Sequence, residues 1–295
     1  MSTARKMIRS LMPEPVRKVI VPLYGEKIIP FCKEAAVTLY AEFANIKDAL
    51  LRRRNRLVPP PQLIFIGAGD FTRTGEEFLR HFIELGGLRP DHKVLDVGCG
   101  IGRMALPLTN YLDRGSYDGF DIVAPGINWC RRRYTPQYPN FHFYLADVYN
   151  KQYRPRGKYP ASQYRFPFAN EYFDFVFLTS VFTHMLPRDM ENYLSEIARV
   201  LKKGQRCVIT WFLLNAESRG LIEAGKGEVH FKYERDGYAT TNQEMPEDAI
   251  AYDEVTVREL YVKLGLEIIE PIRYGAWCGR PDFLTYQDLV VAVKK

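Results

Sequence analysis

The sequence is poor in cysteine and lacks any long apolar run. Its five cysteines, Cys32, Cys99, Cys130, Cys207 and Cys278, form no C-x-x-C pair and have no nearby histidine at ligand spacing, so we expect neither a disulfide framework nor a metal site. No apolar stretch approaches the roughly 20 residues that span a bilayer, and charged residues and prolines between positions 9 and 18 break any signal-peptide core. We therefore expect a cytoplasmic protein with reduced thiols.

Outside the N-terminal segment the sequence also lacks an excess of charge of either sign. Residues 1–60 hold 12 basic and 5 acidic residues, whereas residues 61–295 hold 29 basic and 30 acidic residues. A nucleic-acid enzyme more often carries its positive field around the catalytic cleft. The distribution therefore disfavours a nucleic-acid partner.

The first 61 residues are predicted to be a helical appendage. Apolar residues recur at helical spacing over residues 34–57, and Pro59-Pro60-Pro61 then ends the helix. Residues 1–30 interleave apolar and basic side chains. This pattern suits either a helix packed on the main domain or a peripheral contact with the inner face of a membrane, whose anionic lipids attract basic groups. Both interpretations stay open, as does contact with a partner.

From residue 62 to residue 295 the pattern alternates helix and strand. Helix-like stretches at 75–85, 102–112, 125–134 and 188–201 separate short apolar or β-rich runs, an order that predicts crossover connections and a mainly parallel sheet with the doubly wound, Rossmann-like α/β fold. Residues 215–252 are a polar insertion without strong periodicity, which we expect to form part of a substrate cap. A helix at 255–264 and two strands, near 266–274 and 287–293, complete the domain, and they suggest an antiparallel end to the sheet.

The segment VLDVGCGIGR, from Val94 to Arg103, holds the main functional signal. A buried strand ends in it, glycines stand at positions 98, 100 and 102, and a helix follows at once. Glycine lets a backbone turn sharply close to a ligand, and the helix N-terminus offers free N–H groups. The spacing G-x-G-x-G differs from the dinucleotide pattern G-x-G-x-x-G, and no phosphate-binding G-x-x-x-x-G-K-[ST] occurs. NAD and ATP are therefore weak candidates for the cofactor.

This loop, together with Asp121, Asp147 and the run FDFVFLTSVFTHM, resembles the class I S-adenosylmethionine-dependent methyltransferases over residues 63–214. The resemblance implies a seven-stranded sheet whose last strand is antiparallel, and S-adenosylmethionine as the cofactor. It places the ribose hydroxyls at Asp121 and the adenine amino group at Asp147. The remaining cofactor-binding residues that it implies lie in the same loops: Asp96, Gly98, Gly100, Gly102, Ile122, Val148 and Thr179.

The residues after the fourth strand bear on the methyl acceptor. Enzymes that methylate nucleobase amines resemble one another in an N/D-P-P-Y/F loop there, whereas this chain reads LTSVFTH. His184 can reach the mouth of the cleft and take a proton from a hydroxyl group, with Glu254 and Asp253 as the next candidates for the base. A histidine that only hydrogen-bonds the loop is the alternative.

The C-terminal segments supply aromatic and charged side chains for an acceptor wall. Tyr252, Tyr274, Trp277 and Arg280 suit a polyhydroxylated ligand, although Tyr274 and Trp277 could also simply pack between strands and insertion. The predicted activity is O-methylation of a hydroxylated small molecule or glycan. Transfer to nitrogen or carbon, and a cofactor-binding scaffold without turnover, are the alternatives.

Overall fold

The computed structural model describes residues 56–295 apart from 68 and 152. Two compact units are distinguished, and the larger comprises Asn55–Pro59 and Ile64–Lys295. The predictions for residues 1–55, namely the helical appendage and the membrane contact through residues 1–30, lie outside the described residues. In the described part of the chain, no helix combines the length and the apolar character needed to cross a membrane.

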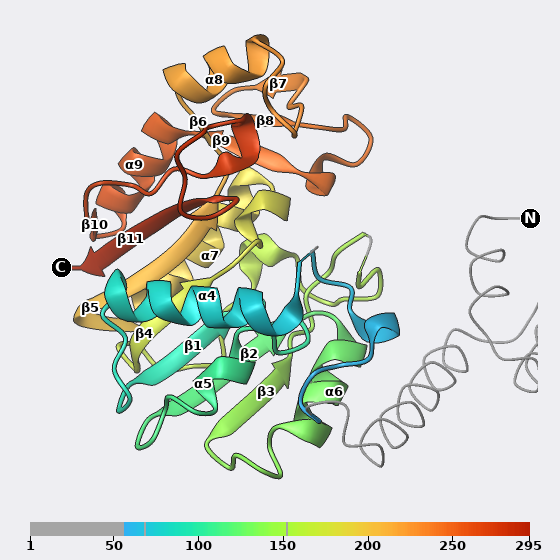
Figure 1. The fold of residues 1–295 in the computed structure, drawn as a ribbon, viewed down its shortest axis with the longest axis vertical. Coiled ribbons are helices and arrows are strands. Elements are labelled where there is room, and N and C mark those ends of the chain that lie inside the picture. The colour runs from blue at the N-terminus through green and yellow to red at the C-terminus, as the bar shows by residue number, and fades with distance from the viewer. Residues whose placement is uncertain (1–55, 68, 152) are drawn as a thin grey trace, which may run out of the picture. The chain divides into compact units, whose positions relative to one another are not determined.

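A seven-stranded sheet forms the centre of the larger unit (Figure 1), in the order β10-β11-β5-β4-β1-β2-β3. The first five strands along the chain pair in parallel, and β11 runs antiparallel to both β5 and β10. This confirms the predicted fold class, including the antiparallel last strand. The strands are β1 (Lys93–Val97), β2 (Ser116–Asp121), β3 (Phe141–Leu145), β4 (Phe173–Leu178), β5 (Leu201–Trp211), β10 (Leu266–Ile268) and β11 (Asp288–Lys294).

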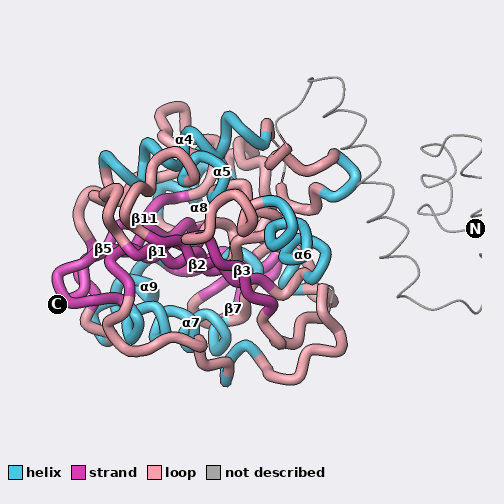
Figure 2. The backbone as a smooth tube through the Cα atoms, turned by 90° about the horizontal axis from the view of Figure 1, so that it is seen from below, coloured by secondary structure: helices cyan, strands magenta, loops and turns pink. Residues whose placement is uncertain are grey.

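Helices cover both faces of this sheet (Figure 2). On one face lie α4 (Phe71–Glu84), α5 (Ala105–Leu108) and α6 (Ala124–Arg133), and on the other lie α7 (Pro187–Val200) and α9 (Glu254–Lys263). The predicted helix at 102–112 is much shorter than expected, because only α5 has α-helical geometry there. The helix expected from residue 75 begins at Phe71, where the side chain of Asp70 accepts a hydrogen bond from the Arg73 N–H at 2.7 Å.

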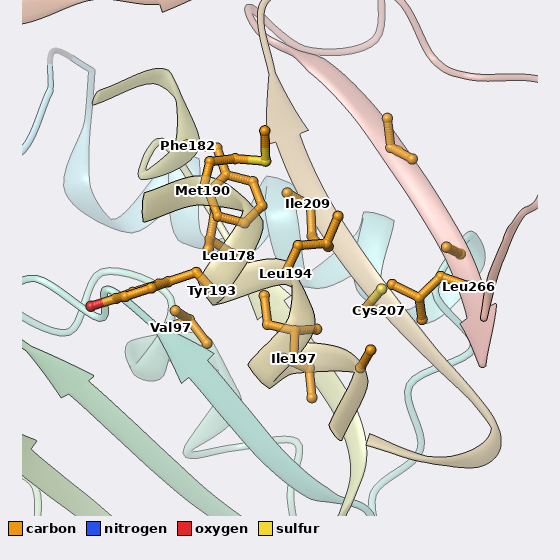
Figure 3. Close-up of a cluster of buried hydrophobic side chains, with 14 of the residues drawn as sticks. Val97, Leu178, Phe182, Met190, Tyr193, Leu194, Ile197, Cys207, Ile209 and Leu266 are labelled. Carbon is orange, nitrogen blue, oxygen red and sulfur yellow. The ribbon is translucent and has the colours of Figure 1, made fainter. Parts of the chain in front are cut away.

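Apolar side chains of α7 form the core on its face of the sheet (Figure 3). Tyr193, Leu194 and Ile197 recur at three and four residues and are buried against the strands, beside Val97 and Ile209. Burial on both faces explains why the central strands read as continuous apolar runs. On the opposite face, the Phe82 ring of α4 stacks on Phe177 with centroids 4.4 Å apart.

The insertion is more ordered than its sequence indicated. Most of a second, four-stranded sheet, in the order β6-β9-β8-β7, is formed by residues of this insertion, and β6 directly precedes it. The strands of this sheet are two to four residues long, too short for an alternating pattern to be visible. The elements of this cap are β6 (Leu213–Leu214), α8 (Ala216–Glu223), β7 (Tyr233–Arg235), β8 (Tyr238–Thr240) and β9 (Ile250–Asp253).

Candidate functional site

The glycine loop follows β1 at the carboxyl edge of the large sheet. Gly98 and Gly100 have φ of 86° and 56°, in the region that favours glycine. A Cβ on Gly98 would lie 2.3 Å from Cγ2 of Val181, and one on Gly100 would lie 2.8 Å from Cγ2 of Ile66. Neither position has room for a side chain. The absence of a Cβ therefore lets Val181 and Ile66 pack directly on the backbone of this loop.

Asp121, at the end of β2, holds this loop. Its Oδ2 accepts a hydrogen bond from the Gly100 N–H and its Oδ1 accepts one from the Val123 N–H, both at 2.8 Å. Burial raises the pKa of Asp121, and these backbone N–H groups oppose that rise. Each carboxylate oxygen has a second lone pair. Asp121 can therefore still accept a pair of hydroxyl donors from a ligand.

Asp96 lies in β1 directly before the glycine loop and is 1% exposed. Its Oδ2 accepts a hydrogen bond of 2.6 Å from the Tyr117 hydroxyl. Oδ1 is buried and has no hydrogen-bond partner among the residues described. Burial raises the pKa of Asp96 to about 8, against the effect of the Tyr117 hydrogen bond. An unpaired buried oxygen at this position fits a site that receives a donor or cationic group from a ligand.

Asp147 follows β3 and is more exposed. Its Oδ1 accepts hydrogen bonds from Nη2 and Nε of Arg154, at 2.9 and 3.2 Å, and these donors lower the pKa of Asp147. Oδ2 remains available for a ligand amino group. Of the neighbouring residues predicted to bind cofactor, Val148 is buried and Ile122 is half-buried against the core. They offer apolar surface beside the two carboxylates.

The loop after β4 brings polar groups to the same edge. Thr179 is half-buried, and Ser180 is exposed with a φ of 57°. His184 ends a 3₁₀ turn, Phe182–His184, and its exposed ring places Nδ1 3.0 Å from the carbonyl oxygen of Glu247. A carbonyl only accepts, so Nδ1 carries the hydrogen in this contact and Nε2 is the basic nitrogen.

The two alternative bases are engaged in hydrogen bonds with other side chains. Asp253 accepts a hydrogen bond of 2.6 Å from Nη2 of Arg219. Burial tends to raise the pKa of Glu254, but donors from Asn215, Arg258 and Tyr274 outweigh it and lower that pKa. Within residues 56–295, with 68 and 152 set aside, no hydrogen bond or ion pair joins either carboxylate to His184. Each of the three predicted bases is therefore held by a different set of partners.

Two residues of the predicted acceptor wall are buried. The Trp277 ring has no exposed surface, and its Nε1 donates a hydrogen bond of 2.8 Å to Oδ2 of Asp288. Tyr252 is 1% exposed, and its hydroxyl donates to the carbonyl of Met185 at 2.5 Å. Trp277 therefore packs inside the protein, which is the alternative that the sequence left open for it. Tyr252 is buried in the same way, and its role in acceptor binding stays a prediction.

Tyr274 and Arg280, in contrast, line an open cavity of about 350 Å³. The Arg280 guanidinium lies 4.7 Å from the centroid of the Tyr274 ring. Arg280 also donates to Glu217 and Asp288, so its side chain is fixed. The other residues of the cavity wall are Glu217, Ile272, Arg273, Asp282, Phe283 and Leu284.

One further polar group, formed by Ser180, Thr210 and Gln287, could not be expected from the sequence. Its hydrogen bonds join residues 30, 77 and 107 positions apart. Only the pairing of β4, β5 and β11 brings these residues together. A serine directly after the fourth strand was the one available signal.

Comparison with known proteins identifies the domain that carries this site. Residues 94–204 match the family of methyltransferase domains. A phthiotriol/phenolphthiotriol dimycocerosates methyltransferase of Mycobacterium leprae is 30% identical over 180 residues, which cover 60% of this chain and 56% of that protein. A fatty-acid O-methyltransferase of Mycolicibacterium smegmatis is 33% identical over 112 residues, 38% of this chain and 34% of that protein.

The fold agrees with these sequence matches. A solved structure from Pyrococcus horikoshii OT3 covers 80% of this chain and 96% of its own, with a TM-score of 0.54 and 18% identity. The family match over residues 94–204 supports the class I S-adenosylmethionine-dependent methyltransferase fold and cofactor that the glycine loop predicted. The chain spans about half the length of the first of the curated relatives and about a third of the second.

Proposed function

We propose that this protein transfers the methyl group of S-adenosylmethionine to an oxygen atom of a lipid-like small molecule. The exposed His184 imidazole carries this proposal. Its Nδ1 lies 3.0 Å from the Glu247 carbonyl oxygen, which leaves Nε2 as the base. The loop that ends in His184 packs against the glycine loop, because the Val181 side chain occupies the space that a Cβ on Gly98 would need. The names of the two relatives, one for a fatty acid and one for dimycocerosates, support a lipid acceptor.

The cofactor fits the residues at the sheet edge. Gly98, Gly100 and Gly102 would hold it against bare backbone, Asp121 would accept from its ribose hydroxyls, and Asp147 would accept from its adenine amino group. The buried Oδ1 of Asp96 would face its cationic end, and Ile122, Val148 and Thr179 would line the site. When bound, the cofactor supplies a methyl group on a sulfonium.

The chain's own residues must align the acceptor and remove its proton. An alcohol has a pKa far above neutrality, so Nε2 of His184 takes the hydroxyl proton as the oxygen attacks. A carboxylic acid has already lost its proton at neutral pH. His184 is therefore required for alcohol acceptors and not for carboxylate acceptors.

The test compares His184→Ala with His230→Ala, a histidine of the cap region, as a matched control. Release of S-adenosylhomocysteine is measured with a long-chain diol, an alkylphenol, decanoic acid and a methyl glycoside. With the alcohols, His184→Ala should lower kcat by about 10²- to 10⁴-fold, while calorimetric affinity for S-adenosylhomocysteine stays unchanged.

Other outcomes decide against particular parts of the proposal. Retention of most turnover with the alcohols would move the base elsewhere, with Asp253 or Glu254 next in line. Turnover of the glycoside alone would replace the lipid by a sugar. Binding of the cofactor without transfer to any acceptor, nitrogen compounds included, would favour a silent scaffold.

A further inference from the structure

Three polar side chains form a closed ring of hydrogen bonds where the strands β4, β5 and β11 meet the carboxyl edge of the sheet. The Ser180 N–H donates to Oγ1 of Thr210 at 2.7 Å. The Thr210 hydroxyl donates to Oε1 of Gln287 at 2.7 Å. Nε2 of Gln287 donates to Oγ of Ser180 at 2.9 Å. Ser180 follows β4, Thr210 lies near the end of β5, and Gln287 directly precedes β11.

The available hydrogen atoms determine which group donates and which accepts in each bond of this ring. The Ser180 N–H donates to Thr210, and Oε1 of Gln287 can only accept, so the one hydroxyl hydrogen of Thr210 goes to Gln287. The Gln287 amide is thereby oriented with Nε2 toward Ser180. One amide hydrogen of Gln287 and the hydroxyl hydrogen of Ser180 have no acceptor among the residues that the structure describes. The ring therefore presents two adjacent donors to solvent.

The backbone of Ser180 adds a second, independent observation. Its φ of 57° lies in the left-handed region that non-glycine residues rarely adopt, and the residue is exposed. Such strained residues persist only where neighbouring structure fixes them, and they cluster at functional sites. Here the buried Thr210 holds Ser180 through the hydrogen bond that the Ser180 N–H donates to it. The next residue, Val181, covers Gly98 of the cofactor loop.

We propose that Ser180 and Gln287 bind the head group of a methyl acceptor that carries two neighbouring oxygen atoms, as a carboxylate or a diol does. Ser180 and Gln287 donate to this pair of oxygens and so hold one of them for methylation. Thr210 is a positioning residue that orients both donors. This inference rests on the proposed function and adds the chemistry of the head group to it.

The experiment uses the full chain saturated with S-adenosylhomocysteine and measures binding of three probes by calorimetry: decanoic acid, 1,2-decanediol and 1-decanol. Ser180→Ala should weaken binding of whichever two-oxygen probe the wild type prefers by about fivefold, the loss expected for one hydrogen bond. It should change binding of 1-decanol by less than about twofold, because a single oxygen can still be held by Gln287. Gln287→Leu should act in the same direction. Tyr286→Phe, which removes a hydroxyl from the residue next to Gln287, is the control and should change neither value.

The preferred probe separates an acid from a diol as the source of the two oxygens. Ser180→Gly removes the hydroxyl together with the backbone strain, so it should reproduce Ser180→Ala. Recovery of wild-type binding in Ser180→Gly would show that conformation, and not the hydroxyl, matters. The inference would be overturned if Ser180→Ala weakened binding of all three probes equally or weakened none of them. It would also be overturned if the wild type bound neither two-oxygen probe. Binding is measured without methyl transfer, so failure of the proposed function is detected separately.

Discussion

The hydroxyl of Tyr117 lies 2.6 Å from Oδ2 of Asp96, and both side chains are buried in the sheet directly before the glycine loop. This pair places an acid next to the cofactor site in surroundings that disfavour its charge. The structure therefore links folding stability to the protonation of Asp96.

The first prediction concerns pH. Burial raises the pKa of Asp96 to about 8 in the folded chain, whereas an unfolded chain has a value of about 4. The folded state thus holds a proton that the unfolded state releases, and the stabilisation from this proton is lost as pH rises through that window. The free energy of unfolding should fall by up to about 1.4 kcal/mol per pH unit, as measured by urea unfolding between about pH 5 and 9. Asp288, whose pKa burial raises to about 6, adds to this slope mainly below that pH. Asp96→Asn should therefore reduce the slope between about pH 6 and 8, Asp236→Asn should retain it, and parallel curves for all three proteins would contradict the assignment.

The second prediction concerns Gly98. In Gly98→Ala the new Cβ would lie 2.3 Å from Val181, at a φ of 86°. We expect a lower melting temperature and loss of calorimetric binding of S-adenosylhomocysteine. Gly204 has a similar φ of 74°, and a Cβ added there would meet no atom within 4 Å. Gly204→Ala should therefore cost only about 1–2 kcal/mol of backbone strain and leave affinity unchanged, and equal affinity losses in both variants would argue against a role for the loop.

The third prediction concerns Asp288, which is fully buried. It accepts hydrogen bonds from the backbone N–H groups of Leu213 and Gly275 and from the Trp277 indole, at 2.7, 2.7 and 2.8 Å. Asp288→Ala leaves these donors and the Arg280 guanidinium without their acceptor. The free energy of unfolding should fall by about 3–5 kcal/mol, measured by chemical denaturation. Asp282→Asn, on the exposed loop, should have little effect, and a loss below about 1 kcal/mol in Asp288→Ala would contradict this role.

The central part of the fold could be predicted because its signals are local. The glycines at 98, 100 and 102 and the apolar spacing of α7 each reflect a single segment. The cap sheet could not be predicted, because its strands are short and gain their stability from pairing. The length of α5 was also misjudged, since its apolar run continues in turns that are not α-helical.

Within the candidate site, the sequence indicated residue types better than their surroundings. The resemblance assigned Asp121 to the same cofactor site as the loop, and in the structure the Gly100 and Val123 N–H groups donate to its carboxylate. Its contact with the cofactor stays a prediction. The sequence could not show that Trp277 is buried against Asp288, or that Arg154 already contacts Asp147. Such contacts depend on side-chain directions that no spacing rule contains.

The connection between the two sheets limits how the acceptor site can change. Only Phe212 separates β5 from β6, and its carbonyl accepts a hydrogen bond of 2.9 Å from the Tyr252 N–H of β9. This junction, together with the hydrogen bond from the Leu213 N–H of β6 to Asp288 of β11, sets the orientation of the cap on the central sheet. An acceptor cap transplanted from a relative by cutting at residues 215 and 252 would lose this register. A working exchange of acceptor specificity would have to move the end of β5 and the start of β11 together with the cap.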